Sequence, residues 1–360
     1  MQRLLFLDSL RGLAALAVVF FHYTTVYRSL FGHSFSQAYD IDFGLYGVEF
    51  FFIISGFVIF LTLSRIKSSR DFLFNRVVRL YPAYIFCLLT TFGLVQYFGL
   101  EGLETSFTDM LVNLTMFQRA VGVPDVDGAY WSLFSEWMFY LLMVSLFIFK
   151  KLDKILWVGA AWLVLNVVNM HFMHLGAAAR LLNLYHGVFF YTGILFYMLY
   201  TGSGRKTTIH LHLAAAFAVA LSFFALKGWT DMLVGVVVYL VFYLCINGRL
   251  TFLVNKPLLF LGSISYALYL FHQYIGYIII NQTKAYFGDS ILVIVPPLLI
   301  SIACAYLITS YVEQPTVNYL KKLYKGYTSK PVLKGTESGF TPQRYLKTQR
   351  LLHDHKRKQF

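Results

Sequence analysis

The sequence is poor in charged residues, cysteine and proline. Asp, Glu, Lys and Arg make up 13% of its 360 residues, whereas a soluble domain usually contains about 25%. There are three cysteines and eight prolines, and no spacing typical of a disulfide framework or a zinc site is present. A nucleotide-binding loop, a dinucleotide fingerprint and an internal repeat are also missing. These absences argue against a soluble nucleotide-dependent enzyme and against a disulfide-rich secreted protein.

Apolar residues dominate instead, at 58% of the chain, with 19% aromatic residues. A helix that crosses a bilayer needs about 20 mostly apolar residues. The sequence therefore predicts an all-α, polytopic integral membrane protein with about ten transmembrane helices. The predicted spans are residues 5–28, 44–63, 79–99, 130–149, 155–170, 179–200, 209–226, 232–247, 257–281 and 291–312.

The net charge of +13 is explained by membrane orientation, so we expect no nucleic-acid partner. Most of the 30 Lys and Arg residues fall in segments that share one side of the membrane if the N-terminus is cytoplasmic. The positive-inside rule therefore predicts both termini in the cytoplasm. The basic residues left on the opposite side are Arg28, Arg119, Arg180, Lys227 and Lys284.

The composition divides the chain into a transmembrane domain, residues 1–312, and a basic cytoplasmic tail, residues 313–360. The tail is interpreted as a solvated segment, with contact to anionic membrane lipids as the alternative. A cleaved signal peptide is the main alternative for residues 1–25. Asp8 and Arg11 interrupt its apolar run, which favours an uncleaved first span.

The first span contains three ionisable residues, Asp8, Arg11 and His22, in the stretch FLDSLRGLAALAVVFFHY. Positions 8, 11, 15, 18 and 22 follow the spacing of one helical face. Ionisable groups inside a membrane are costly and usually mark a functional site. We therefore predict that this stripe faces a polar interior.

Four titratable residues are predicted to lie at a similar depth. With a rise of about 1.5 Å per residue, His22, Glu49, Glu136 and His272 all fall near the outer third of the membrane. A histidine beside a carboxylate suits general-base catalysis, so we expect Glu136 or Glu49 to orient His22. The alternative for each residue alone is a structural, hydrogen-bonded group.

Arg76 and Arg79, in FNRVVRLYPAY, open the third span from the cytoplasmic side. Paired arginines suit phosphate groups, although simple positive-inside anchoring explains them equally well. Histidine pairs at 171 and 174 and at 210 and 212 lack a third ligand, so we expect no metal site.

Together these stretches resemble the acyltransferase 3 family of integral membrane O-acyltransferases, which modify bacterial surface polysaccharides. The matching segments, in the family's order, are residues 6–23, GVEFFFIISGFVIF at 47–60, residues 74–84, YWSLFSEWMFYLL at 130–142, LGSISYALYLFH at 261–272 and EQP at 313–315. Glu49 stands where the family often has Asp, and Gln314 replaces a usual Arg.

The resemblance implies transfer of an acyl group, usually acetyl, from cytoplasmic acyl-CoA to a hydroxyl of a carbohydrate or glycolipid outside the bacterial inner membrane. It implies that His22 is the essential histidine, with Asp8 and Arg11 as its polar pair and Glu136 and Glu49 as further catalytic candidates. It also implies that Arg76 and Arg79, with Arg11, hold the donor. The other candidates are Ser55, Tyr140, Trp131, Tyr266 and His272.

Two alternatives remain open from the sequence. The first is a covalent acyl-histidine or acyl-serine intermediate. Ser55 is the candidate serine, although a Ser-Gly pair in a membrane helix is more often a packing or kink device. A transporter of a polar or anionic solute would also place charges inside the membrane. The appended extracytoplasmic domain of some relatives is not expected, so the chain is predicted to act alone or with a separate partner.

Overall fold

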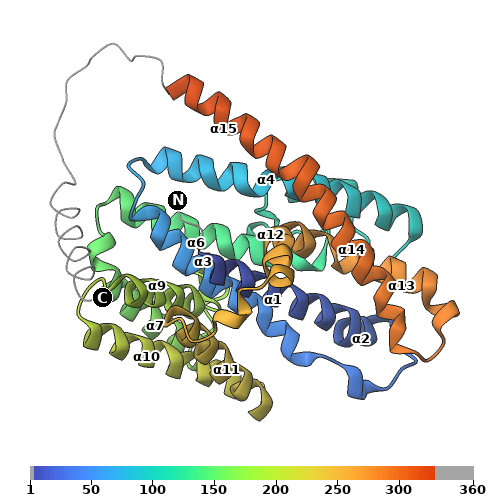
Figure 1. The fold of residues 1–360 in the computed structure, drawn as a ribbon, viewed down its shortest axis with the longest axis horizontal. Coiled ribbons are helices and arrows are strands. Elements are labelled where there is room, and N and C mark those ends of the chain that lie inside the picture. Colours follow the sequence, from blue (N-terminus) through green and yellow to red (C-terminus); the bar gives the residue numbers. More distant parts are fainter. Residues whose placement is uncertain (1–3, 329–360) are drawn as a thin grey trace. The chain divides into compact units, whose positions relative to one another are not determined.

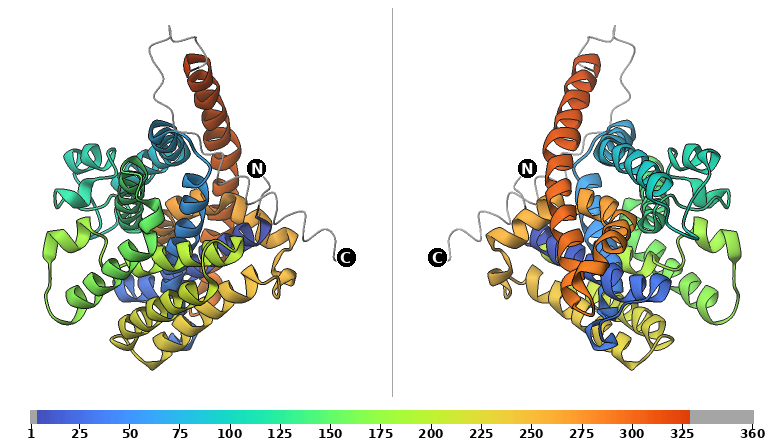
Figure 2. Two further views of the ribbon diagram at one scale, coloured as in Figure 1. Left: turned by 90° about the vertical axis from the view of Figure 1, so that its left-hand side faces the viewer. Right: turned by 90° about the vertical axis from the view of Figure 1, so that its right-hand side faces the viewer.

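A computed structural model describes residues 4–328, and this part of the chain is helical without any β-strand (Figures 1 and 2). The longer helices are α1 (Leu5–Phe21), α3 (Gly47–Leu63), α4 (Ser69–Phe98), α6 (Trp131–Ile148), α7 (Ile155–His171), α9 (Gly187–Thr201), α10 (Lys206–Ala225), α11 (Trp229–Ile246), α12 (Lys256–Phe271), α13 (Gln273–Phe287), α14 (Val295–Leu307) and α15 (Gln314–Thr328). The shorter ones are α2 (Tyr27–Phe31), α5 (Phe107–Asn113) and α8 (Gly176–Leu181). Two π-helices, His22–Val26 and Ile308–Glu313, continue α1 and α14.

Eight helices in the described residues are long and apolar enough to cross a membrane, or nine if the bent pair α12 and α13 is one span. The all-α, multi-pass prediction is therefore confirmed. The apolar helix α9 falls within the predicted span 179–200 but has only 15 residues, and the count of ten stays a prediction. Helices suit a membrane because the backbone N–H and C=O groups inside a helix form their hydrogen bonds within the same segment.

Several boundaries differ from the prediction. Helix α4 begins at Ser69 and not at residue 79, so Arg76 and Arg79 lie inside this helix and do not open it. Residues 257–281 do not form one straight span, because the chain bends by 75° between α12 and α13, and His272 lies at the bend. The last span does not end at residue 312, because helical structure continues through the π-helix into α15. The remainder of the predicted tail, residues 329–360, lies outside the described residues.

Glycines bring the central helices together. Helix α1 packs along α12, and α3 packs along α9 (Figure 1). A Cβ at Gly262 would lie 1.9 Å from the carbonyl oxygen of Asp8, and one at Gly56 would lie 2.0 Å from that of Phe190. Small residues allow membrane helices to approach backbone to backbone. This close packing holds the polar face of α1 inside the bundle.

Candidate active site

Helices α1, α3, α4, α6 and α12 enclose a cavity of about 130 Å³, called here the central cavity. Of the predicted site residues, it brings together Arg11, Ser55, Arg76, Arg79, Glu136, Tyr140 and Tyr266. Sequence reasoning missed three polar lining residues, Ser132, Ser265 and Tyr269. Serine and tyrosine carry no charge that would mark them in an apolar span, and the chain has 26 tyrosines.

The lining of the central cavity is cationic, with three arginines against the single carboxylate of Glu136. Arg11 lies 3.5 Å from the carboxylate of Asp8, which is itself buried. The guanidinium of Arg76 lies 5.6 Å from the ring centre of Phe72 and 5.8 Å from that of Tyr140. Its buried Nε has no hydrogen-bond partner among the described residues. Because an unsatisfied buried donor is costly, this group favours an anion in the cavity.

Arg79 is held differently from Arg76. It forms an ion pair with Glu313, and its guanidinium lies 5.2 Å from the ring centre of Tyr266. The Tyr266 hydroxyl in turn donates to the carbonyl of Leu80 at 2.9 Å. Glu313 begins the EQP motif and is buried. It was not predicted as a cavity partner, because the sequence placed it in a solvated tail.

Glu136 connects α3 with α6. Its Oε1 accepts hydrogen bonds from the Ser55 hydroxyl at 2.9 Å and from the Tyr140 hydroxyl. Ser55 immediately precedes Gly56, whose contact with α9 fixes this part of α3. Ser55 is therefore held as a hydrogen-bond donor to the carboxylate of Glu136 inside the cavity. A serine and a carboxylate in this relationship are compatible with either a structural or a nucleophilic role.

His22 is paired with His272 and not with a carboxylate. Its Nδ1 lies 2.9 Å from Nε2 of His272 and 2.9 Å from the carbonyl oxygen of Val18. The sequence interpretation, in which Glu136 or Glu49 orients His22, is therefore wrong about the partner. Glu136 bonds to Ser55 and Tyr140. Glu49 lies in the first turn of α3, and its Oε2 has no hydrogen-bond partner in the part of the chain that the structure describes.

The hydrogen bonds assign the protons of the histidine pair. Nδ1 of His272 lies 2.9 Å from the carbonyl oxygen of Tyr269 and 3.1 Å from that of Leu268, so this nitrogen carries hydrogen. In the neutral ring Nε2 is then an acceptor, and it receives the Nδ1 hydrogen of His22. This assignment leaves a lone pair on Nε2 of His22. The pair therefore presents one imidazole nitrogen as a base, oriented by a second imidazole.

Both histidines lie at breaks in regular helix. His22 opens the π-helix that follows α1, and His272 lies at the bend before α13. π-Helices occur frequently at functional sites. The hydroxyl of Tyr23 donates to the carbonyl of His272 at 2.9 Å, which ties the two breaks together.

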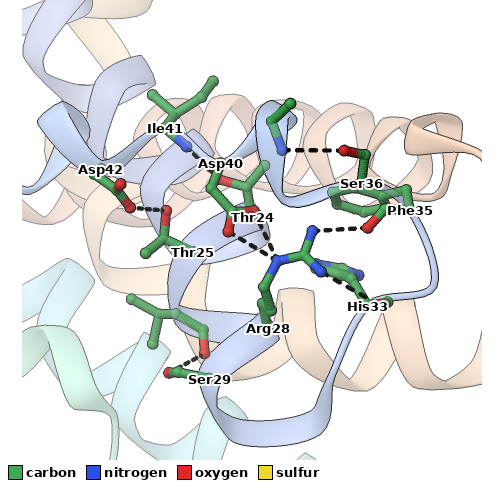
Figure 3. A network of polar contacts seen from close by, with 12 residues as sticks. Thr24, Thr25, Arg28, Ser29, His33, Phe35, Ser36, Asp40, Ile41 and Asp42 are labelled. Carbon is green, nitrogen blue, oxygen red and sulfur yellow. Dashed lines mark hydrogen bonds and ion pairs between the residues drawn. The ribbon is translucent and has the colours of Figure 1, made fainter.

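The loop of residues 28–42 folds over the π-helix (Figure 3). Arg28 bonds to the carboxylate of Asp40 and to the carbonyl of Phe35, and Thr24 accepts from the amide of Ile41 at 3.1 Å. His33 reaches the carbonyl of Tyr23 with its Nε2 at 2.7 Å. The loop therefore contacts the residues that follow His22 directly.

Trp131 lies outside the central cavity. Its ring centre is 5.0 Å from that of His186 and 6.0 Å from that of Phe52. His186, between α8 and α9, has a buried Nδ1 without a hydrogen-bond partner among the described residues. Trp131 thus packs against a histidine and a phenylalanine. In residues 4–328 no three His, Cys, Asp or Glu side chains lie together as metal ligands.

A family model for an acyltransferase domain, acyltransferase family 3, matches residues 4–310. The chain belongs to this family. It is therefore a multi-pass membrane acyltransferase, and the transporter alternative is not supported. The match includes the central cavity residues up to Tyr269 and both members of the histidine pair. No curated protein and no solved structure matched the chain.

Proposed function

We propose that this membrane acyltransferase moves an acyl group, in the simplest case acetyl, from cytoplasmic acyl-CoA to a hydroxyl of an extracytoplasmic carbohydrate. The candidate acceptors are O-antigen, capsule, exopolysaccharide and lipid-linked glycosides. The bacterial inner membrane is the expected location. The observation that carries the proposal is the pairing of a cationic cavity with a histidine base. The three cavity arginines suit phosphates, and Nε2 of His22 suits a hydroxyl proton.

The donor would bind with its phosphates toward Arg76 and Arg11. Arg76 is favoured because its buried Nε lacks a partner, and because guanidinium groups bind phosphate oxygens in pairs. Arg79 is already neutralised by Glu313, so its contribution is smaller. Tyr269 lines the cavity and its carbonyl accepts from His272, which links the donor space to the histidine pair.

Transfer then moves one proton in two steps, first to His22 and then to the leaving group. Nε2 of His22 takes the proton of the acceptor hydroxyl as the oxygen attacks the thioester carbonyl. The new oxygen–carbon bond forms, the carbon–sulfur bond breaks, and the proton passes to the departing CoA thiolate. His272 keeps the imidazole of His22 in the tautomer that has a free Nε2. A positioned base of this kind typically accelerates a reaction about 10²- to 10⁴-fold.

A covalent route through Ser55 is the competing mechanism, and its hydrogen bond to Glu136 is the reason to test it. In that route the serine would carry the acyl group between donor and acceptor. Wild-type protein mixed with labelled acetyl-CoA without acceptor would hold a hydroxylamine-sensitive label. A Ser55→Ala variant that retains transfer, together with no trapped label, would favour direct transfer.

The decisive assay uses the full chain in lipid nanodiscs with radiolabelled acetyl-CoA and a polysaccharide fraction from the host envelope. We expect release of free CoA thiol and recovery of label in alkali-sensitive esters of the carbohydrate. Thiol release without label in carbohydrate would contradict the acceptor class. No thiol release with any acyl-CoA would contradict the donor.

A further inference from the structure

A second hollow lies away from the central cavity, among residues of the loop between α4 and α6. Its volume is about 600 Å³, and we call it the loop hollow. Most of its lining residues belong to this loop, and Arg180 and Tyr274 reach it from α8 and α13. The charge pattern predicts that this loop is extracytoplasmic. The loop hollow and the central cavity would then open toward opposite faces of the membrane.

The two spaces approach each other at the turn that begins α6. Gly128 lines the loop hollow and Ser132 lines the central cavity, one helical turn further along. Between them, the carbonyl of Ala129 accepts hydrogen bonds from the hydroxyl of Tyr269 at 2.8 Å and from that of Ser132 at 3.3 Å. The linings of the two spaces are therefore connected through this turn.

His272 stands along the chain between Tyr269, which lines the central cavity, and Tyr274, which lines the loop hollow. The amide of Tyr274 donates to the buried carboxylate of Asp127 at 3.1 Å, which fixes the start of α13 against the loop. His272 therefore lies at the 75° bend, between residues that line the two spaces.

A buried acceptor atom lies beneath the floor of the hollow. A Cβ on Gly128 would lie 2.5 to 3.0 Å from the amide atoms of Gln273, so this amide packs directly against Gly128 and leaves no room for a larger residue. Gln273 is buried, and its Oε1 has no hydrogen-bond partner among the described residues. A buried acceptor without a partner is unusual, and this one directly follows His272 in the chain.

The charges of the loop hollow are balanced, unlike those of the central cavity. Arg119 is paired with Asp125 at 2.5 Å, and Arg180 and Glu104 supply one further charge of each sign. Guanidinium groups only donate hydrogen bonds and carboxylates only accept them. Such an alternating lining suits hydroxyl groups, which do both, and gives no net attraction to phosphates. Tyr274 adds an aromatic side chain to the same wall.

We propose that the loop hollow binds an uncharged sugar unit of the acceptor and delivers one of its hydroxyls past Gly128 toward the histidine pair. This inference rests on the proposed function. It adds a location for the acceptor and a chemical class for the unit that is bound there.

The test is a matched pair of Val→Trp substitutions in the full chain. Val123 lines the loop hollow, whereas Val121 is 69% exposed and is not part of its lining. Each variant replaces the chromosomal copy in the host, and ester-linked acyl groups per sugar are measured on the surface glycan by mass spectrometry. Binding of acetyl-CoA to the same purified proteins is measured in parallel.

We expect Val123→Trp to lower glycan acylation at least tenfold with acetyl-CoA affinity unchanged, and Val121→Trp to resemble the wild type. The acylated unit should be an uncharged sugar. Wild-type acylation by Val123→Trp would overturn the location, and acylation of a uronic or phosphorylated unit would overturn the chemical class. A wild-type strain without any acyl ester on its glycans would overturn the proposed function itself, and this inference with it.

Discussion

Nδ1 of His22 lies 2.9 Å from Nε2 of His272, and this contact joins two breaks in helical structure that are 250 residues apart. A second imidazole takes the place that a carboxylate has in many catalytic triads. It orients the ring of His22 without adding negative charge inside the membrane.

Replacement of His22 by Ala removes the proposed base. We expect acyl transfer to fall about 10²- to 10⁴-fold, with acetyl-CoA affinity unchanged, because His22 does not line the central cavity. Acyl transfer by the His272→Ala variant should fall by a smaller factor. This change removes the orienting group but leaves the Val18 carbonyl as an acceptor for Nδ1 of His22. Thiol release and equilibrium binding, measured on nanodisc protein, separate the two effects. Full activity of His22→Ala would exclude the proposed mechanism.

The sequence located most of the central cavity but not the partner of His22. Polar residues such as Arg11, Arg76 and Glu136 stand out in apolar helices because burying them is costly. The depth argument placed His22 and His272 in one layer, and the two residues do meet. It could not say which of the four titratable residues are in contact, because it assumed straight helices with a constant rise. The π-helix after Phe21 and the bend at His272 break that assumption, and neither leaves a signal in hydropathy.

The same limitation explains why the sequence did not identify the uncharged residues of the site or Glu313 near the end of the helical part. Tyr269 and Ser132 look like ordinary packing residues until the fold brings their hydroxyl oxygens to 2.8 Å from each other. Glu313 was assigned to a tail because the apolar run ends at Val312, yet the π-helix carries its carboxylate back to Arg79. Local changes of helix type and long-range packing, not composition, determine these contacts.

Arg76 and Arg79 should behave differently when each is replaced by Ala. Arg76 has no ion pair among the described residues, so we expect Arg76→Ala to weaken acetyl-CoA binding about tenfold or more with little loss of stability. Arg79→Ala leaves the buried carboxylate of Glu313 without its ion-pair partner, which lowers the free energy of unfolding by about 1–3 kcal/mol. Its thermal midpoint should fall, and the double variant with Glu313→Gln should recover part of the loss. Isothermal titration with acetyl-CoA and thermal unfolding provide the two measurements. Equal donor affinity in wild type and Arg76→Ala would remove Arg76 from the donor site.

Gly56 should not tolerate a methyl group. A Cβ there would lie 2.0 Å from the carbonyl oxygen of Phe190, so Gly56→Ala must push α3 away from α9 and displace Ser55. We expect a loss of about 1–3 kcal/mol, as for other overpacked cores, together with reduced activity. Gly93→Ala in α4 is the matched control, because nothing lies within 4 Å of its Cβ position. Thermal unfolding in detergent compares the two variants, and equal midpoints would contradict the close packing of α3 and α9.

The loop of residues 28–42 should loosen in acid through His33. Burial lowers the pKa of this half-buried histidine, and the nearby charges of Arg28 and Lys284 act in the same direction, against the opposing effects of the Tyr23 carbonyl and Asp40. The unfolded chain therefore binds the proton more readily, near a pKa of about 6.5. Stability contributed by His33 is present above that pH and is lost as the pH falls through the lower folded value. Hydrogen–deuterium exchange of this loop, corrected for the intrinsic pH dependence of exchange, should show weaker protection at pH 5 than at pH 7.5. His33→Gln should reduce this difference, whereas His174→Gln, at an exposed histidine outside the loop, should retain it. An unchanged pH dependence in His33→Gln would assign the effect to another group.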